Sequence, residues 1–503
     1  MADTKREIER KYESDESGLP DLTGVAGVKT VIDKGVASLD AVYYDTADER
    51  LAAASITLRR RTGGSDAGWH LKLPVEPGVR DEIREPLSDT VPRALAGLVR
   101  SRAREAELVP VVRLRSDRDV RHLVDAQGTL LAEVSVDAVH AERLTEGGGT
   151  AQWTEMEVEL ADDGDPAFLD KVEKRLRKAG VRPSSSASKL ARALSETAPK
   201  KKQRKTPPAP EEPRTAGDHV LVYIRAQRDA ILELDPAVRQ DAHDSVHRMR
   251  IATRRLRSAF RSYGKVLDRT VTDPIGEELK WLASELGVDR DREVMTERLT
   301  SVLAELPRTL VSGPIRTRMR TWAGARRGGS RRRLTGVLDS KRYLALLDTL
   351  DALVAEPPLL PDAAGGPAKV IGKAVRKDLG KVSALVEQAL ATAEPGTDRD
   401  VALHEARKKA KRTRYAAEAA TPALGDSART LAKSMKSLTS LLGDHQDSVM
   451  VRLTLRELSA VAHAAGESSF TYGVLYGREE QRAAGVEAAL PEVWKGIVAE
   501  ASV

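Results

Sequence analysis

The chain has 503 residues, which predicts two or three domains, and a hydrophobic fraction of 41% is enough for folded cores. It contains no cysteine, which excludes disulfides and thiolate metal sites, and only 3% of its residues are aromatic. Lys and Arg (82) slightly outnumber Asp and Glu (76). There is no apolar signal segment at the start and no run of about 18 apolar residues, so we expect a soluble, cytoplasmic protein with basic surfaces that bind a polyanion.

Residues 5–160 consist of short β-type runs separated by Gly, Pro and Asp, a pattern typical of a barrel or a sandwich. Besides a charged strand near the start, strands are predicted at 29–34, 37–45, 55–62, 69–74, 79–85, 109–117, 130–139 and 152–160. Helices are predicted at 91–98, 166–179 and 186–196.

The charged strand near the start runs from Glu7 to Glu13. Alternation would place Glu7, Glu9 and Lys11 on one face. Such a strand is either a solvent-exposed charged edge or one wall of a closed polar cavity. In a cavity, the carboxylates would suit Mg²⁺ or Mn²⁺, and the ammonium would suit an anion held beside the metal. The remaining strands decide between these two interpretations.

Charged rows recur on the later strands, each opposite an apolar row. Alternation pairs Arg59 with Arg61, Lys72 with His70, Arg113 with Arg115, Glu133 with Asp137, and Glu157 with Glu155 and Glu159. One such strand is normally a solvated face. So many, with acids and bases in balance, favour a barrel with a polar lumen and an apolar exterior covered by helices. Cations in that lumen suit a polyphosphate, and carboxylates suit the divalent ions that accompany it.

A composition change separates this region from the rest of the chain. Residues 199–213 are charged and rich in proline, without apolar residues larger than Ala, which is typical of a linker. We therefore expect one domain at 1–198, a linker at 199–215 and a second domain at 216–495. In the second domain the hydrophobic period is helical and no convincing strand occurs.

The helical region contains an internal duplication, with repeats at about 216–356 and 368–495 on either side of a Pro/Gly break. His247-x-x-Arg250 recurs as His404-x-x-Arg407, Arg254-Arg255-x-Arg257 recurs as Lys411-Arg412-x-Arg414, and Leu286-Gly287-x-x-x-Asp291 recurs as Leu442-Gly443-x-x-x-Asp447. The motifs keep nearly the same spacing in both repeats, which favours a duplicated helical bundle.

Each repeat carries a basic stripe on one helix. At 100° per residue, the first basic stripe collects His247, Arg250, Arg254, Arg257 and Arg261 within about 80° of arc, opposite an apolar face. The second basic stripe consists of His404, Arg407, Lys411 and Arg414. One stripe could be a solvated face, but two in matching register favour a shared groove. Because aromatic residues are not interleaved, a base-free polyanion fits better than single-stranded nucleic acid. Arg255 and Arg412 lie off the stripes and are expected to be structural, and Asp291 or Asp447 is expected to orient an arginine.

The motifs of the first domain resemble those of a known family. The ordered set is Glu7-x-Glu9-x-Lys11, Tyr44-Asp45-Thr46, Leu58-Arg59-x-Arg61, Trp69-x-Leu71-Lys72, Glu157-x-Glu159 and Ser188-Lys189. Over residues 1–197 this set closely resembles the CYTH domain of triphosphate tunnel metalloenzymes. Residues 216–495 resemble the CHAD domain, a helical module that binds polyphosphate. The resemblance implies an α+β multidomain protein, with an eight-stranded antiparallel tunnel and flanking helices followed by an all-α duplicated bundle.

The resemblance also assigns residues. Glu7, Glu9, Asp137, Glu157 and Glu159 would bind Mg²⁺ or Mn²⁺, with Glu82 and Glu85 as secondary candidates. Lys11, Arg59, Arg61, Lys72, Arg118 and Lys189 would bind the triphosphate, together with Arg113 and Arg115 if no bulge shifts the register near 113–118. Lys11, Arg59, Arg61, Lys72, Glu157 and Glu159 would be catalytic. The two basic stripes would bind polyphosphate.

The implied activity is metal-dependent hydrolysis of inorganic triphosphate to diphosphate and phosphate. Adenylyl cyclase and thiamine triphosphatase remain alternatives, although the scarcity of aromatic residues disfavours an organic substrate. A non-enzymatic tether to polyphosphate granules is a third alternative, and complete carboxylate motifs disfavour it. The expected partners are triphosphate and polyphosphate rather than nucleic acid or membrane. The expected location is the cytoplasm, including polyphosphate granules.

Overall fold

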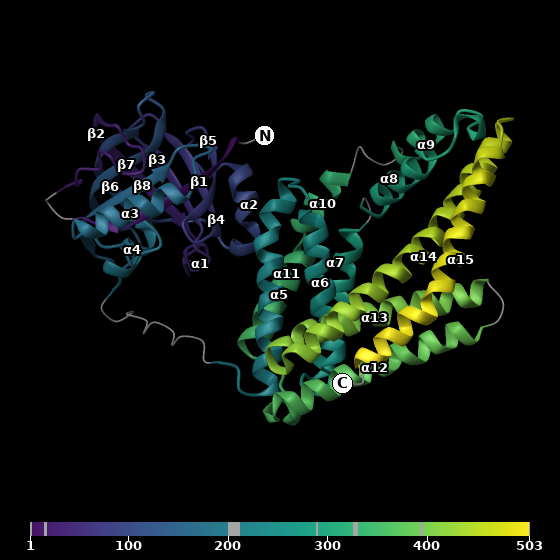
Figure 1. Ribbon diagram of the computed structural model, residues 1–503. Helices are drawn as coiled ribbons and strands as arrows, with labels where there is room; N and C mark the ends of the chain where they lie inside the picture. The colour runs from purple at the N-terminus through teal and green to yellow at the C-terminus, as the bar shows by residue number, and fades with distance from the viewer. Residues whose placement is uncertain are drawn as a thin grey trace. The chain divides into compact units, whose positions relative to one another are not determined.

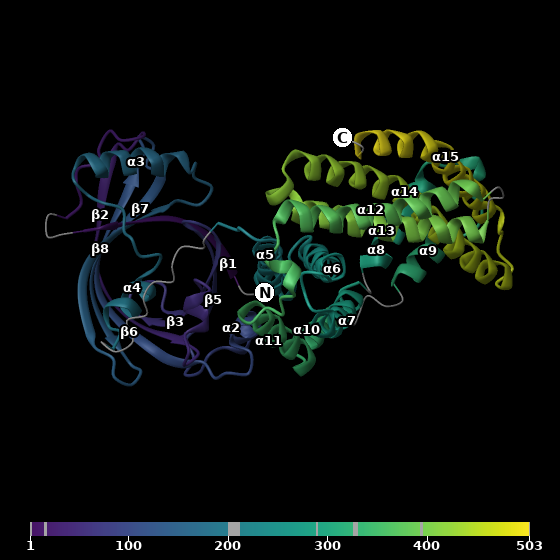
Figure 2. The same ribbon diagram turned by 90° about the horizontal axis from the view of Figure 1, so that it is seen from below.

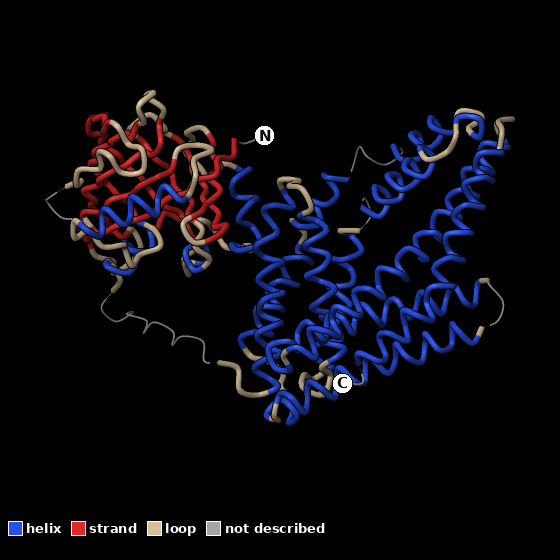
Figure 3. Tube along the Cα trace, viewed as in Figure 1, coloured by secondary structure: helices blue, strands red, loops and turns tan. Residues whose placement is uncertain are grey.

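The computed structural model describes residues 3–14, 18–199, 212–287, 290–324, 330–392 and 396–501. The chain divides into two compact units, Met1–Ala209 and Pro210–Val503, which are described separately. Among the residues that the structure describes, strands occur in the first unit and the second unit is helical (Figure 3). Most of the predicted linker lies outside the described residues. None of the described helices is both long enough and apolar enough to span a membrane.

The first unit is a closed barrel of eight antiparallel strands, as predicted (Figure 1). The strands are β1 (Asp3–Glu13), β2 (Thr30–Asp45), β3 (Thr57–Thr62), β4 (Gly68–Glu76), β5 (Val79–Glu85), β6 (Val109–Val124), β7 (Leu130–Arg143) and β8 (Thr150–Leu160). Their order around the barrel is β1-β5-β4-β3-β2-β6-β7-β8, and β1 closes the ring by pairing with both β5 and β8.

One strand prediction was wrong in detail. The segments 29–34 and 37–45, predicted as two strands, form the single strand β2. A register shift between Asp33 and Gly35 marks a β-bulge, and Gly35 has φ of 83°. A glycine within a predicted strand suggests that the strand ends there. Here the glycine only accommodates the extra residue of the bulge, and the strand pairing continues on both sides of it.

Helices cover the apolar exterior of the barrel. They are α1 (Arg50–Ala53), α2 (Arg93–Ala103), α3 (Ala167–Lys178) and α4 (Lys189–Glu196). Val158 of β8 belongs to the same buried cluster as Leu169 of α3, and Leu71 of β4 clusters with Leu95 of α2. The predicted arrangement of apolar exterior rows beneath helices is confirmed.

Helix α4 occupies one end of the barrel. In Figure 1 it lies at the lower end, and in Figure 2, seen from below, it lies across the opening of the ring. Its residues Leu190 and Leu194 are buried in one cluster with Tyr43, Leu114 and Trp153 from three strands. This end of the lumen is therefore filled by apolar side chains, and the charged side chains line the other part of the lumen.

The second unit contains only helices among its described residues. They are α5 (Ala216–Arg239), α6 (Ser245–Ser262), α7 (Arg269–Glu285), α8 (Arg290–Ala304), α9 (Ile315–Gly324), α10 (Ser330–Leu338), α11 (Lys341–Ala355), α12 (Pro367–Ala391), α13 (Thr397–Leu424), α14 (Asp426–Ala464) and α15 (Phe470–Ala501), with 3₁₀ turns at Arg308–Leu310 and Pro361–Ala364. The first begins with a capping box between Thr215 and Asp218. The two basic stripes lie on α6 and α13, which pack against each other.

Candidate functional site

The charged part of the barrel lumen encloses a cavity of about 660 Å³. Its charged lining consists of Lys5, Glu7, Glu9, Lys11, Lys34, Arg59, Arg61, Asp66, Lys72, Arg80, Glu82, Arg84, Arg118, Glu133, Glu157, Glu159, Asp162 and Lys189. These are ten Lys or Arg side chains and eight Asp or Glu side chains. The lining of the cavity therefore has a small excess of basic side chains.

Strand register places the acidic residues of the cavity side by side. Glu9 of β1 lies directly opposite Glu159 of β8, and Glu159 lies opposite Glu133 of β7. We call Glu9, Glu159 and Glu133 the acidic row. Like charges directly opposite each other on neighbouring strands repel, and a divalent cation bound between them would remove that repulsion. Carboxylate oxygens are also the ligands that Mg²⁺ and Mn²⁺ prefer, so the donor set fits such an ion.

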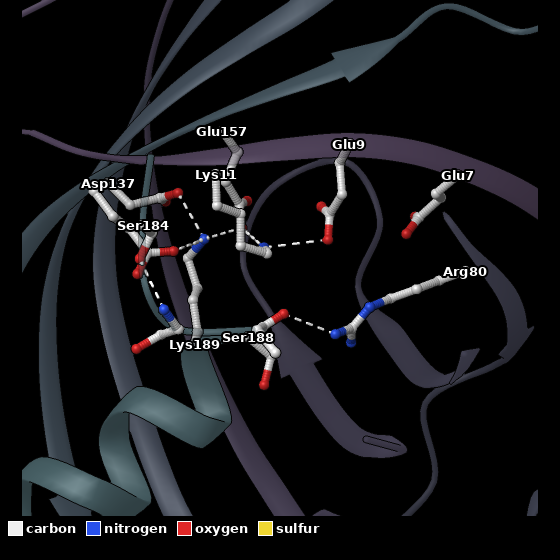
Figure 4. A network of polar contacts seen from close by, with 12 residues as sticks. Glu7, Glu9, Lys11, Arg80, Asp137, Glu157, Ser184, Ser188 and Lys189 are labelled. Atoms are coloured by element: carbon white, nitrogen blue, oxygen red, sulfur yellow. Dashed lines mark hydrogen bonds and ion pairs between the residues drawn. The ribbon is translucent and has the colours of Figure 1, made fainter. Parts of the chain in front are cut away.

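Lysines already pair with several of these carboxylates (Figure 4). Lys11 contacts Glu157 and lies 3.2 Å from Glu9, and Lys72 contacts Glu7. Burial alone would lower the pKa of Lys11, but its two carboxylate partners raise it instead. A bound metal ion would pair with the carboxylates in place of the lysines, and a bound phosphate chain would pair with the lysines in place of the carboxylates.

Lys189 connects the cavity to its closed end. Its ammonium lies 2.7 Å from Glu155, 2.6 Å from Glu157 and 3.2 Å from Asp137. Burial opposes the charge, yet the three carboxylates raise the pKa of Lys189. The same contacts, with Lys11, hold the pKa of Glu157 well below its usual range despite burial. Lys189 stays charged and Glu157 stays ionised at neutral pH.

Backbone contacts fix the segment that carries Lys189. The amide of Ser184 donates to the Lys11 carbonyl of β1 at 2.9 Å, and Arg80 donates to the Ala187 carbonyl at 2.8 Å. Ser188 caps α4 by accepting from the Ala191 amide at 3.0 Å. Lys189 therefore points into the lumen from the first turn of a firmly anchored helix (Figure 4).

Glu7 differs from the other carboxylates of the cavity. Its burial raises its pKa to about 7, and the nearby charges of Glu82 and Glu159 act in the same direction while Lys72 opposes them. Near neutral pH this carboxyl is therefore partly protonated in the absence of a metal ion. A cation bound beside it would favour the ionised form.

Two arginines of β3 line the cavity, one paired with a hydroxyl group and the other with a carboxylate. Arg59 donates to the Tyr43 hydroxyl at 3.2 Å. Arg61 pairs with Asp66 on the loop after β3. Burial lowers the pKa of Arg61 to about 9, and the charges of Arg59 and Arg118 add to that shift. The buried, mutually repelling guanidinium groups would gain most from an anionic ligand.

The structure brings most of the predicted site residues to the cavity. Glu7, Glu9, Lys11, Arg59, Arg61, Lys72, Arg118, Glu157, Glu159 and Lys189 all line it. Asp137 lies behind this lining at 0% exposure, where it accepts from Arg118 at 2.8 Å and contacts Lys189. Asp137 thus positions two cations in this structure instead of lining the cavity.

Arg113 and Arg115 do not reach the cavity. Pairing with β7 runs without a register shift from Val112 to Leu123, so residues of even number share the inward face with Arg118. The two arginines are odd-numbered and face outward, where Arg113 pairs with Asp40. No bulge shifts the register between 113 and 118, yet both arginines lie on the face opposite Arg118, so the structure does not bring them to the candidate triphosphate site.

Alternation also explains the lining residues that sequence analysis missed. On β5, Arg80, Glu82 and Arg84 face the cavity, while Val79 and Ile83 are buried on the other face. Only Glu82 had been considered, as a secondary metal candidate. It accepts from His70 at 2.8 Å and from Arg84. The apolar residues on the odd face of β5 were the available signal. Glu85, the other secondary candidate, is not part of the lining.

In the helical unit, cations of the two basic stripes lie close together. Burial lowers the pKa of Lys411 to about 8, and the charges of Arg407, Arg254 and Arg414 add to this shift. Because Arg254 lies on α6 and Lys411 on α13, both helices contribute cations to the same region. Such mutual repulsion would be relieved by a polyanion.

A glycine lies beneath one arginine of each stripe. A Cβ atom at Gly287 would come within 2.8 Å of a terminal nitrogen of Arg250, and one at Gly443 would come within 3.2 Å of Arg407. Arg250 is only 7% exposed. These distances explain the repeated Leu-Gly motif, because the absence of a side chain lets each guanidinium lie against the next helix.

The remaining charged residues of the repeats have structural partners. Arg255 pairs with Glu418 and Arg412 pairs with Asp378, as expected for arginines off the stripes. Asp447 contacts Arg298 at 3.3 Å, which agrees with the expected role of orienting an arginine. The side chain of Asp291 lies outside the described residues.

Asp400, His445 and Glu487 from three helices form a compact cluster in the second repeat. His445 lies 3.1 Å from Glu487 and 3.4 Å from Asp400. However, Arg399 pairs with Glu487 at 2.7 Å and Arg452 lies 3.6 Å from Asp400. Two arginines thus balance two carboxylates, and the cluster is an ion-pair network that ties α13, α14 and α15 together.

Comparisons with known proteins match two domain families to this chain. Residues 5–194 match the CYTH domain and residues 222–456 match the CHAD domain. Uncharacterised proteins from two strains of Mycobacterium tuberculosis are each 38% identical to the chain, over 98% of this chain and 97% of the relative. Among solved structures, PptA from Streptomyces chartreusis is 20% identical over 56% of this chain and 99% of its own, with a TM-score of 0.48. The CHAD domain from the plant Ricinus communis is 23% identical over 59% of this chain and 96% of its own, with a TM-score of 0.44.

Fold and site together define a charge-lined antiparallel tunnel, followed in the chain by a helical domain whose two basic stripes lie on packed helices. The chain belongs to the CYTH–CHAD proteins. As a family, CYTH proteins are triphosphate-hydrolysing enzymes that generally depend on a divalent metal, and CHAD domains associate with polyphosphate.

Proposed function

We propose that the barrel hydrolyses inorganic triphosphate to diphosphate and phosphate with Mg²⁺ or Mn²⁺, and that the helical domain binds inorganic polyphosphate. The observation that carries the first part is the combination of ten cationic side chains with an acidic row in one enclosed lumen. Cations alone would suit any anion. Cations facing carboxylates that lie directly opposite one another suit an anion that arrives with a divalent metal ion.

The residues divide the work by chemistry. Arg59, Arg61 and Arg118 offer planar guanidinium groups for paired contacts to phosphate oxygens, and Lys11 and Lys72 offer point charges. The acidic row, with Glu157 and Glu7, would hold the metal. When bound there, the ion would acidify a water molecule and stabilise charge on the phosphate oxygens. The protein thus contributes positioning and charge stabilisation and forms no covalent intermediate.

The lining favours an inorganic substrate. Among the described residues that line the cavity, Tyr43 supplies the only aromatic ring besides the imidazole of His122. A nucleobase or a thiazole ring usually binds against aromatic or broad apolar surfaces, which this lining offers only sparsely. Hydrolysis of an organic triphosphate such as ATP or thiamine triphosphate is the second candidate. Aliphatic residues such as Val36 and Leu130 in the lining are the observation that favours it.

In the helical domain, the basic stripes of α6 and α13 would bind a thin, flexible chain of phosphates. The support for this binding is the convergence of Arg254, Arg407 and Lys411. Association with polyphosphate granules in the cytoplasm would follow from this binding. A tether without hydrolysis would use the same two basic stripes, so binding alone does not distinguish the two functions.

The test is phosphate release by the purified full-length protein from tripolyphosphate, ATP, thiamine triphosphate and long-chain polyphosphate, each with Mg²⁺, Mn²⁺ or EDTA. We expect tripolyphosphate to be the best substrate and EDTA to abolish release. A faster reaction with an organic triphosphate would replace the inorganic assignment. Polyphosphate binding without hydrolysis of any of the four compounds would support the tether.

A further inference from the structure

Tyr43 connects the two halves of the barrel lumen. Its ring is buried among Leu190 and Leu194 of α4 at the apolar end. The residue also lines the charged cavity, and strand pairing sets it opposite Arg59 on β3. The side chain is 3% exposed. Its hydroxyl therefore lies at the boundary between the filled end of the lumen and the open, charged part.

Arg59 depends on this hydroxyl. Arg59 donates to the Tyr43 oxygen at 3.2 Å, whereas its Nε has no hydrogen-bond partner in the part of the chain that the structure describes. Within the same part, no carboxylate lies within ion-pairing distance of Arg59. Lys72, Arg118 and Lys189, by contrast, each contact at least one carboxylate. Arg59 is thus a partly buried cation whose hydrogen-bond partner among the described residues is the Tyr43 hydroxyl, while the charge of Glu82 acts on it from a greater distance.

We propose, on the basis of the function proposed above, that the Tyr43 hydroxyl contacts the substrate. The hydroxyl accepts a hydrogen bond from Arg59 and donates one to a terminal phosphate oxygen at the closed end of the cavity. A hydroxyl that accepts from a guanidinium still has its hydrogen available. A phosphate oxygen is the acceptor that the surrounding cations would bring there. Because α4 closes this end, a phosphate chain that enters from the open end reaches Tyr43 with its terminal group.

The electrostatic environment strengthens the phenol as a donor. Burial would raise the pKa of Tyr43, but the charge and hydrogen bond of Arg59, followed by the charges of Lys189 and Lys72, lower it. A more acidic hydroxyl forms a stronger hydrogen bond to an anionic acceptor. The inference concerns the free terminal phosphate, so it applies equally to inorganic and organic triphosphates.

The variant Tyr43→Phe tests the inference because it keeps the ring that packs on α4 and removes only the hydroxyl. The matched control is Tyr44→Phe, since Tyr44 packs against Trp69 at 4.9 Å in the exterior cluster. Tripolyphosphate binding to the full chain is measured by titration calorimetry in EDTA, where no turnover occurs. We expect Tyr43→Phe to weaken binding by about tenfold or more, as for a hydrogen bond to a charged group, in a protein that is still folded at the temperature of the titration. Tyr44→Phe should bind as the parental protein does.

A second variant shows whether the hydroxyl acts together with Arg59. Arg59→Ala should weaken binding more than Tyr43→Phe, and the double variant should lose less than the product of the two single effects. Equal affinity of Tyr43→Phe and the parental protein would overturn the inference, as would failure of the parental protein to bind tripolyphosphate. Binding that depends on Tyr43 in a protein that releases no phosphate with any metal would support the inference and refute the proposed hydrolysis.

Discussion

Replacing Lys189 by Met would place three carboxylates in the barrel without their shared cation. Lys189 is 8% exposed and lies within 3.2 Å of Asp137, Glu155 and Glu157. Removing one partner of a buried ionic cluster costs about 3–5 kcal/mol. For a domain of this size, that lowers the melting temperature of the barrel by about 6–20 °C.

The effect should depend on pH with a definite sign. Burial opposes ionisation of Glu157 and Asp137, but their cationic neighbours, Lys189 among them, hold both pKa values below the usual range. A carboxyl with a lowered pKa in the folded state adds stability above its unfolded pKa and loses it as the pH falls. The difference between the parental protein and Lys189→Met should therefore be largest above about pH 5 and shrink in more acidic solution.

Differential scanning calorimetry of the full chain from pH 4 to 8 measures this difference. The control is Lys5→Met, because Lys5 lines the same cavity but its side chain is 37% exposed and pairs with Glu159. An exposed pair contributes about 0–1 kcal/mol, so this control should melt close to the parental protein. Mn²⁺ should partly restore Lys189→Met by neutralising the same carboxylates. Equal melting of both variants at pH 7.5 would refute the idea that a buried charge cluster holds the site together.

Three further predictions follow from particular groups. Burial raises the pKa of Glu7 to about 7, so its contribution to stability is full below about pH 4.5 and is lost as the pH rises to 7; Glu7→Gln should flatten that part of a denaturant-stability profile. Arg254→Glu with Lys411→Glu should remove most polyphosphate binding at about 0.15 M salt while circular dichroism stays unchanged, because neither side chain is fully buried, and a parental affinity would leave only a generic basic surface. Gly443→Ala should favour the helix by about 1 kcal/mol yet weaken polyphosphate binding by displacing Arg407, so unchanged binding would contradict the role of the glycine.

The barrel wall was predictable because strand alternation has a period of two. Glu7, Glu9 and Lys11 were placed on one face from sequence alone, and all three line the cavity. The same rule failed near 113–118 because alternation gives two faces without saying which is inward. There, Arg118 faces inward and Arg113 outward, and the choice becomes clear only from the pairing with neighbouring strands.

Long-range contacts explain what sequence reasoning could not find. From its strand alone, Tyr43 is expected to be an ordinary core aromatic residue. Its position between the apolar end and the charged cavity becomes visible only because the closed barrel brings Arg59 and α4 to it. The acidic row likewise depends on the registers of three strands that are distant in sequence. In the helical unit, the helical period predicted each stripe, whereas the meeting of Arg254 with Lys411 required the packing of α6 on α13.

The most direct test of the account is the product ratio from tripolyphosphate, followed by ³¹P NMR with the full-length protein and Mg²⁺ or Mn²⁺. Hydrolysis in the lumen predicts equal amounts of diphosphate and phosphate, no reaction in EDTA, and a loss of rate by orders of magnitude in Glu159→Gln, which disrupts the acidic row. The control Arg113→Gln changes an outward-facing residue and should react at the parental rate. Absence of hydrolysis, or an equal rate in Glu159→Gln and the parental protein, would contradict the assignment of the lumen as a metal-dependent triphosphatase site.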